Sequence, residues 1–190
     1  MAEQSSAAKH RARQTLINLV LALGATVAIA LILVMIVPRD DSNLIKPVDY
    51  KPIAASVKAS AGIEVFAPNK LPDGWWVNSA RWAAAPADGV QYWHIGFVGP
   101  KNQYVGVDQA FKSNTTWIAN RITGFEQKTV SADGIGGGWG LATYQGSTDK
   151  TKGQKIWLFL HFATQEAVLI QGTGKDSEFT QFANMLGFTI

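Results

Sequence analysis

The sequence contains no cysteine, and only three of its 190 residues are histidine. The absence of cysteine excludes disulfide scaffolds, cysteine nucleophiles, thiolate metal sites and iron–sulfur clusters. Charged residues are also scarce, at 16% of the chain, whereas hydrophobic residues make up 47%, too many for a disordered protein. The mean hydropathy is near zero, too low for a protein of many membrane spans. Length and composition therefore suit one ordinary domain with an appendage.

One long stretch of the chain carries no charge. Residues 16–37 are aliphatic except for Asn18, Gly24 and Thr26. A helix of this length reaches about 33 Å, enough to cross a hydrocarbon core of about 30 Å, and it satisfies its own backbone groups in lipid. We therefore predict a transmembrane helix at 16–37 that follows a basic cytoplasmic tail at 1–15.

The residues beside this stretch predict its orientation in the membrane. Lys9, Arg11 and Arg13 precede it, whereas the single Arg39 that follows it is next to two aspartates. The positive-inside rule then places the N-terminus in the cytoplasm and the C-terminal part outside, with the bilayer as the partner of the span. A cleaved signal peptide is the competing interpretation, but its apolar region would be shorter. The sequence favours an uncleaved signal anchor.

The net charge of +3 has the same origin, because most of it lies in the basic tail. No dense cluster of lysine or arginine follows the apolar stretch. The sequence therefore predicts no nucleic-acid partner.

The chain beyond the membrane is predicted to begin with a tether at 38–62. Pro38, Pro47 and Pro52 discourage regular structure there, although a short helix over 53–61 remains open. From Ile63 onward the chain is rich in aromatic residues and glycine, as expected of a domain with its own core.

Residues 63–190 are predicted to form an extracytoplasmic α+β domain. Alternating or continuous apolar residues predict strands at 76–82, 91–98, 104–109, 139–144, 156–162 and 167–171. The short link at 163–166 predicts an antiparallel hairpin between the last two. Helical spacing of apolar residues predicts helices at 114–122 and 177–186. The predicted fold is an antiparallel sheet of about six strands with two helices packed on one face.

The sequence shows no motif that carries chemistry by itself. The glycine run at 134–140 does not match the dinucleotide fingerprint and precedes a strand, so we interpret it as a loop or turn. No strained serine elbow and no metal-ligand spacing is present. We therefore predict no cofactor, no metal and no catalytic residue, and expect that the protein is not an enzyme.

Four residues are the candidates for ligand binding. His94 and His161 are expected on strands, where they could share a sheet face and act as acid and base or bind a metal; a hydrogen-bonded structural role is the favoured interpretation. Trp75 and Trp76 could stack on a sugar or a peptide side chain, although aromatic residues of a small domain are more often core. Because neighbours on a strand point to opposite faces, only one of this pair can face the core.

The order of several short motifs resembles a known family. The motifs are Ala67-Pro68, Leu71-Pro72-Asp73-Gly74-Trp75, Trp93-His94-Ile95-Gly96-Phe97-Val98, Tyr104-Val105 with Gln109, Trp139 with Tyr144, and Gly172-Thr173-Gly174 before a final helix. With the basic tail, span and tether, this order is similar to an actinobacterial family of single-pass envelope proteins, domain-of-unknown-function family 4245. The resemblance implies membrane anchoring and no established activity, and it supplies no catalytic residues.

These observations lead to two hypotheses of function. The leading hypothesis is a membrane-anchored domain that binds an envelope protein or a cell-wall component without catalysis. The alternative is an envelope hydrolase that uses His94 or His161. The alternative gains support if the two histidines converge with a carboxylate in one open cleft, and loses support if each is buried or isolated.

Overall fold

The computed structural model describes residues 3–36, 46–131 and 135–190. The chain divides into two compact units, Met1–Leu44 and Ile45–Ile190. Val37 at the end of the predicted span, residues 38–45 of the predicted tether and Gly134 of the glycine run lie outside the described residues.

The described part of the first unit, residues 3–36, is one long helix, α1 (Glu3–Ile36). Its stretch Lys9–Ile36 is long and apolar enough to cross a membrane, and none of the apolar window is buried within the protein. Such a helix is compatible with a single-pass membrane anchor, and a signal sequence passes the same test of length and composition.

The second unit starts earlier than the sequence predicts. Part of the predicted tether forms helix α2 (Lys51–Ala61), which the weak helical spacing at 53–61 had left open. The side chains of Tyr50, Ala54 and Val57 are buried in the core. The amide of Val48 also donates to the carbonyl of Val77, so this segment is attached to the sheet. Pro52 is compatible with the helix because it lies in the first turn, where no backbone donor is needed.

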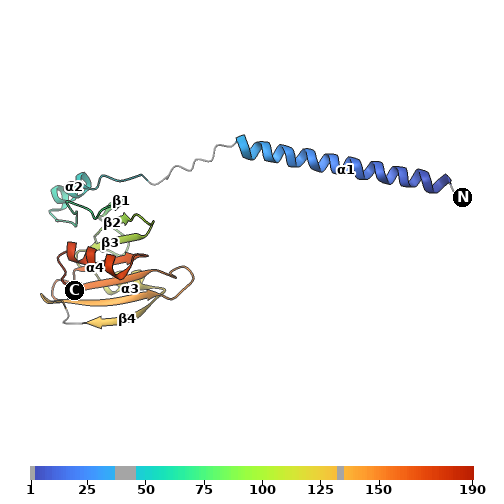
Figure 1. Cartoon of the computed structure of the whole chain (residues 1–190). Coiled ribbons are helices and arrows are strands. Elements are labelled where there is room, and N and C mark those ends of the chain that lie inside the picture. The colour runs from blue at the N-terminus through green and yellow to red at the C-terminus, as the bar shows by residue number, and fades with distance from the viewer. Residues whose placement is uncertain (1–2, 37–45, 132–134) are drawn as a thin grey trace. The chain divides into compact units, whose positions relative to one another are not determined.

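The sheet consists of seven antiparallel strands. They are β1 (Trp76–Ala83), β2 (Tyr92–Val98), β3 (Tyr104–Ala110), β4 (Phe125–Ser131), β5 (Trp139–Gly146), β6 (Lys155–His161) and β7 (Ala167–Gly172), in the spatial order β1-β2-β3-β7-β6-β5-β4 (Figure 1). The antiparallel hairpin predicted from the link at 163–166 is confirmed as β6–β7.

The predicted α+β class is confirmed, but the predicted number of strands is one too low. The missing strand is β4 at the edge of the sheet, which pairs only with β5. All of its residues except Phe125 are exposed, so it has no buried face and no alternation of apolar and polar residues. Edge strands that carry charged residues avoid further pairing, and this one contains Glu126 and Lys128.

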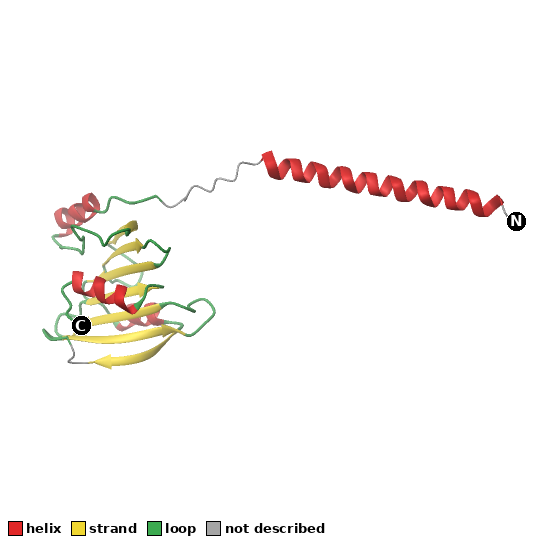
Figure 2. Cartoon of the chain, in the orientation of Figure 1, coloured by secondary structure: helices red, strands yellow, loops and turns green. Residues whose placement is uncertain are grey.

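The two predicted helices form, but they cover opposite faces of the sheet. Helix α4 (Asp176–Met185) buries Phe179 and Phe182 on the face that α2 also covers, whereas α3 (Thr115–Ile122) buries Trp117 on the other face. In Figure 2 the strands partly hide α3 and α4 lies in front of them. The prediction of both helices on one face was therefore wrong. Strands β6 and β7 carry apolar residues on both faces, and each face needs a cover.

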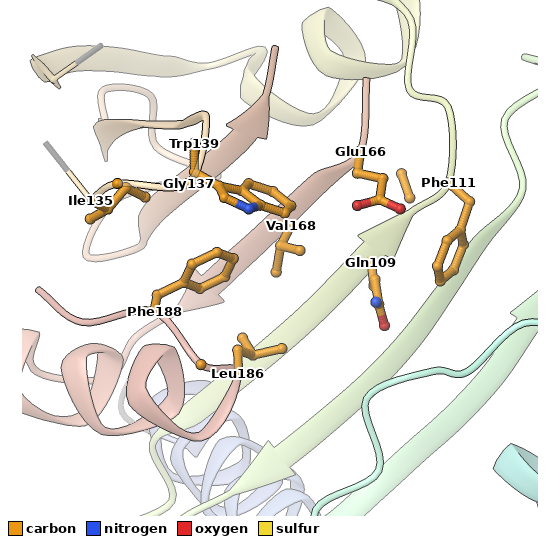
Figure 3. Close-up of a pocket in the computed structure, with 12 residues that line it drawn as sticks. Gln109, Phe111, Ile135, Gly137, Trp139, Glu166, Val168, Leu186 and Phe188 are labelled. Atoms are coloured by element: carbon orange, nitrogen blue, oxygen red, sulfur yellow. The ribbon is translucent and has the colours of Figure 1, made fainter. Parts of the chain in front are cut away.

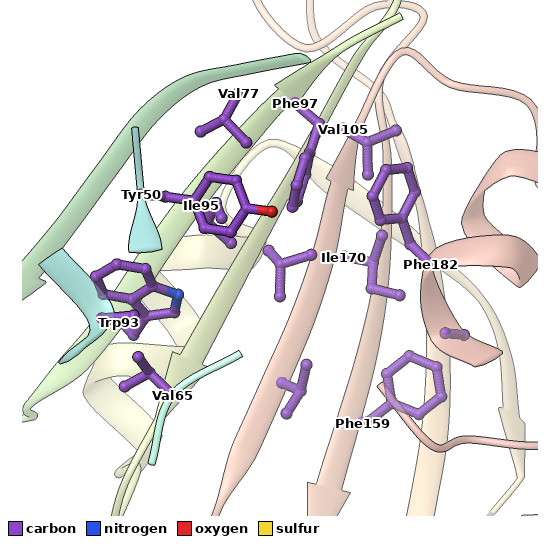
Figure 4. Close-up of a cluster of buried hydrophobic side chains, with 14 of the residues drawn as sticks. Tyr50, Val65, Val77, Trp93, Ile95, Phe97, Val105, Phe159, Ile170 and Phe182 are labelled. Carbon is purple, nitrogen blue, oxygen red and sulfur yellow. The ribbon is translucent and has the colours of Figure 1, made fainter. Parts of the chain in front are cut away.

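The main core lies between the sheet and the helices α2 and α4. Its largest fully buried side chains include Trp93, Phe97, Phe159 and Phe182 (Figure 4). Phe179 is also fully buried there. Phe97 and Phe182 have ring centroids 4.6 Å apart. A smaller cluster under α3 contains Trp117, Ile156, Leu158 and Leu169. Two covered faces of one sheet explain how a chain without disulfides stays folded.

Candidate ligand-binding pocket

A pocket of about 380 Å³ opens on the face of the sheet that carries α4. It is lined by Gln109, Ala110 and Phe111 at the end of β3, Ile135, Gly136, Gly137 and Trp139 at the start of β5, Glu166 and Val168 at the start of β7, and Leu186, Gly187 and Phe188 after α4 (Figure 3). Four segments that are distant in the sequence therefore build one pocket.

Three aromatic rings, all half-buried, line this pocket. Trp139 and Phe188 meet edge to face with ring centroids 5.0 Å apart, and Phe188 also stacks on the buried Phe159 at 4.1 Å. Phe111 packs against Trp82, with centroids 5.9 Å apart. Each ring is thus held by a neighbouring ring, which fixes the shape of the site before any ligand arrives.

Two polar side chains enter the same pocket. The Oε1 atom of Gln109 accepts a hydrogen bond of 2.9 Å from the amide of Phe66, which fixes the orientation of the side chain. The carboxylate of Glu166 forms no ion pair with any residue that the structure describes. Figure 3 shows this carboxylate between the indole of Trp139 and the ring of Phe111. Glu166 is therefore the charged group available to a ligand.

His161 supports one wall of the pocket. Its Nδ1 accepts from the amide of Thr164 at 3.1 Å, so Nε2 carries the proton and donates to the carbonyl of Gly137 at 3.1 Å. Its ring also packs edge to face on Trp139, with centroids 5.1 Å apart. The glycines at 136, 137 and 138 all have positive φ, which confirms a turn at the part of the glycine run that the structure describes. His161 is thus a positioning residue for the turn and for Trp139.

His94 lies in a different place, in a buried polar cluster beside α3. The residue is 6% exposed, and its Nδ1 lies 2.5 Å from Oδ1 of Asp108 on the neighbouring strand. Two hydroxyl groups lie near its Nε2, Ser79 at 3.2 Å and Tyr104 at 3.3 Å. The three strands β1, β2 and β3 supply these groups from adjacent positions on one face.

Asp108 is the centre of this cluster. Its Oδ2 accepts from Nε of Arg121 at 3.1 Å and from the Gln171 amide at 3.2 Å, in addition to the contact of Oδ1 with His94. The Arg121 guanidinium lies over the rings of Tyr92 and Trp117, 4.7 Å from each centroid. The cluster therefore attaches α3 to the sheet by an ion pair, hydrogen bonds and cation–π contacts.

Tyr104 shows the electrostatic character of the cluster. Burial, and next the negative charge of Asp108, raise the pKa of Tyr104 above 10.0, and this rise is partly offset by Ser79 and Arg81. The Tyr104 hydroxyl fills space that is open only because Gly96 and Gly106 face each other across β2 and β3. A side chain at either glycine would collide with it.

The four predicted site residues do not form one site. His94 and His161 lie on opposite faces of the sheet, since His94 pairs with Asp108 beside α3 and His161 packs on Trp139 of the pocket. Trp75 packs edge to face on Phe182, with centroids 5.1 Å apart, and so belongs to the core. Trp76 is the first residue of β1, and its side chain points to the face of the sheet opposite that of the buried Val77. Among the described residues, no group of three or more histidine and acidic side chains is placed to hold a metal ion.

The residues of the pocket carry no motif. Gln109 and Trp139 appear among the family-like motifs, but Phe111, Glu166 and Phe188 have no signal beyond their residue type. The one available hint is Glu166, a carboxylate in the short link between two almost continuously apolar strands.

Comparison with curated proteins and with solved structures returns no match. One family model matches residues 11–186, which include most of α1 and the folded unit as far as Leu186. This match confirms the resemblance to family 4245 that the motif order indicates. The chain belongs to the family described as protein of unknown function, DUF4245.

Proposed function

We propose that this protein is a single-pass membrane protein whose extracytoplasmic domain binds a ligand in the pocket between Trp139, Phe111 and Glu166. The pocket is the observation that carries the proposal, because it combines fixed aromatic rings with a carboxylate that has no described ion-pair partner. Pockets of this volume that combine aromatic side chains with a few oriented polar groups are typical of small-molecule and side-chain binding. The bound group belongs to an envelope component.

The anchor in this proposal is α1, with Lys9, Arg11 and Arg13 on the cytoplasmic side. The absence of native cysteine allows a clean test with the single-cysteine variant Lys152→Cys, at an exposed residue in the β5–β6 connection. A membrane-impermeant maleimide should label this variant in intact cells, and the mature protein should retain its N-terminus by intact mass. Labelling only after lysis, or loss of residues before the folded unit, contradicts the proposed topology.

The pocket is tested by photocrosslinking in intact cells. Phe111 is replaced by benzoylphenylalanine, which keeps an aromatic ring at the pocket. The matched control carries the same group at Phe162, which is 58% exposed and lines a separate groove beside α3. A defined adduct on the variant at Phe111, in excess over the control, is the expected result. Adducts that are equal at both positions, or formed only at Phe162, contradict binding in this pocket.

A second candidate function is hydrolysis with Ser79 as nucleophile and His94 as base. One observation favours it, namely that Ser79 Oγ, the His94 ring and Asp108 follow one another at 3.2 Å and 2.5 Å. This is the connectivity of a Ser-His-Asp triad. The binding proposal explains the same contacts as structural, because His94 is buried, Tyr104 also reaches its Nε2, and the Ser79 hydroxyl donates to Asn78.

A fluorophosphonate probe separates the two functions, since it forms a covalent bond with activated serines. The full-length protein in nonionic detergent should show no adduct on Ser79, whereas a serine hydrolase mixed into the same sample is labelled. Labelling of Ser79 that is lost in His94→Ala would favour the hydrolase and contradict a purely structural cluster.

A further inference from the structure

We infer that the pocket selects an organic ammonium group, so that its ligand is a compact amine or quaternary amine. The inference rests on the proposed binding function and gives it a chemical class. The observations that carry it are the three rings of Trp139, Phe111 and Phe188 that line the pocket and the position of the Glu166 carboxylate between Trp139 and Phe111 (Figure 3).

The aromatic rings supply one part of the recognition. The faces of aromatic rings carry negative charge density, and they attract a cation within about 6 Å of the centroid, with tryptophan the strongest. The three rings are half-buried, so part of each ring surface remains in water and is accessible to a ligand. An organic cation with methyl or methylene groups also gains from apolar contact with Val168 and Leu186, which a bare metal ion would not use.

The carboxylate supplies the charge. Among the residues that the structure describes, the pocket lining includes Glu166 as an acid and includes no lysine or arginine. Glu166 forms no ion pair with the described residues, although other acids of the domain do, such as Asp176 with Lys155 at 2.6 Å. An anionic ligand would be repelled, and a neutral ligand would leave the carboxylate without compensation. A positively charged group between the rings and Glu166 avoids this repulsion and compensates the charge of the carboxylate.

The size of the pocket fits such a group. Its volume of about 380 Å³ exceeds the space of a hydrated small ion and lies within the range of small-ligand sites. Gln109 stands beside the carboxylate with its Oε1 engaged by the backbone of Phe66, which leaves its amide hydrogens for a polar part of the ligand next to the ammonium.

The test is an NMR titration of the full-length protein in maltoside detergent, which lacks a choline headgroup. The indole N–H signal of Trp139, assigned with Trp139→Phe, reports on the pocket. The probes are choline and its neutral carbon isostere 3,3-dimethylbutan-1-ol, with butylammonium as a primary amine. We expect choline or butylammonium to shift the Trp139 signal and to bind at least about tenfold more tightly than the neutral alcohol.

Two variants test the role of charge. Glu166→Gln keeps the shape and should reduce the preference for the cation to about two- to fivefold, the range expected from exposed aromatic rings alone. Glu126→Gln, at an exposed acid of β4 that pairs with Lys128, is the matched control and should leave binding unchanged.

The outcomes separate this inference from the proposed function. If neither choline nor butylammonium binds more tightly than the neutral alcohol, the inference is overturned, but a pocket for another kind of ligand is not. Equal cation binding by the wild-type protein and Glu166→Gln also overturns it. If photocrosslinking at Phe111 yields no adduct in cells as well, the proposed function fails with it. A cation preference that is present in the wild-type protein and in Glu126→Gln but reduced in Glu166→Gln supports both the inference and the proposed function.

Discussion

Replacement of Asp108 by asparagine is the sharpest test of the buried cluster under α3. Asp108 is 2% exposed and accepts from three donors, His94 at 2.5 Å, Arg121 at 3.1 Å and Gln171 at 3.2 Å. An asparagine offers one acceptor oxygen in place of two and turns its own amide hydrogens toward these donors. The variant therefore loses the ion pair with Arg121 and leaves at least one buried donor without a partner.

The expected cost is about 3 kcal/mol of unfolding free energy. Removal of one member of a buried ion pair typically costs about 3 to 5 kcal/mol. The lower end applies here because the Arg121 side chain is 22% exposed and can be solvated after the change. For a domain of this size, 1 kcal/mol corresponds to roughly 2 to 4 °C, so Tm should fall by about 6 to 12 °C.

Urea unfolding of the full-length protein in nonionic detergent, followed by tryptophan fluorescence, measures this cost. All seven tryptophans lie in the unit Ile45–Ile190, so the signal reports on the folded domain and not on α1. The matched control is Asp149→Asn, an exposed residue, which should change stability by less than about 0.5 kcal/mol. The double variant Asp108→Asn with Arg121→Met should lose less than the sum of the single variants, because it leaves no unpaired cation.

A loss of less than about 1 kcal/mol in Asp108→Asn would refute this reasoning, since it would mean that the cluster is already solvated. Additive losses in the double variant would also refute it. They would show that Asp108 and Arg121 act independently, although their atoms lie 3.1 Å apart.

Three further predictions concern the core, the alkaline limit of stability and a hairpin. In urea unfolding, Trp93→Phe should cost about 1 to 2 kcal/mol more than Trp117→Phe. The reason is that the Trp93 indole donates to a backbone carbonyl, whereas the equally buried Trp117 indole has no partner among the described residues. Equal costs would contradict this explanation. The raised pKa of Tyr104 means that the folded state holds the phenol proton more tightly than the unfolded state, so stability is lost as pH rises above 10.0. Tyr104→Phe should reduce that loss in urea unfolding measured between about pH 9 and 11. An unchanged slope of unfolding free energy against pH would argue against this role of Tyr104. Gly146→Ala should lower Tm by more than about 5 °C in a thermal scan, because the added Cβ atom would overlap the Thr151 carbonyl. A Tm near that of the parent protein would show instead that the hairpin adjusts.

Much of the fold could be predicted from local patterns. Strand β2 has Trp93, Ile95 and Phe97 on one face, and helix α4 has Phe179 and Phe182 at helical spacing, so each element is specified by its own residues. Strand β4 could not be predicted this way, because an exposed edge strand is held mainly by backbone hydrogen bonds to its neighbour. Helix α2 was uncertain for a related reason, since its short apolar stripe gains most of its stability from the core on which it packs.

The site was less predictable than the fold. His94 and His161 were chosen for their chemistry, yet the pairing of strands places them on opposite faces, one in a buried cluster and one behind the pocket wall. Trp75 was chosen as an unusual aromatic residue and belongs to the core. Glu166 and Phe188 line one pocket only because the fold brings the β6–β7 link and the segment after α4 to it. The separation of these residues along the sequence gives no indication that they line the same pocket.

The sequence by itself determined the apolar helix with its basic flank, the α+β class, six of the strands and the family, because each follows from local periodicity, charge or motif order. The tertiary structure alone decided which face each helix covers, where the seventh strand pairs, and that Trp139, Phe111 and Glu166 share a pocket. The physical reason is that the central strands β3 and β7 are buried on both faces, so burial alone does not say which helix covers which face. Only the simultaneous packing of α2, α3 and α4 makes that choice, and the pocket is its consequence.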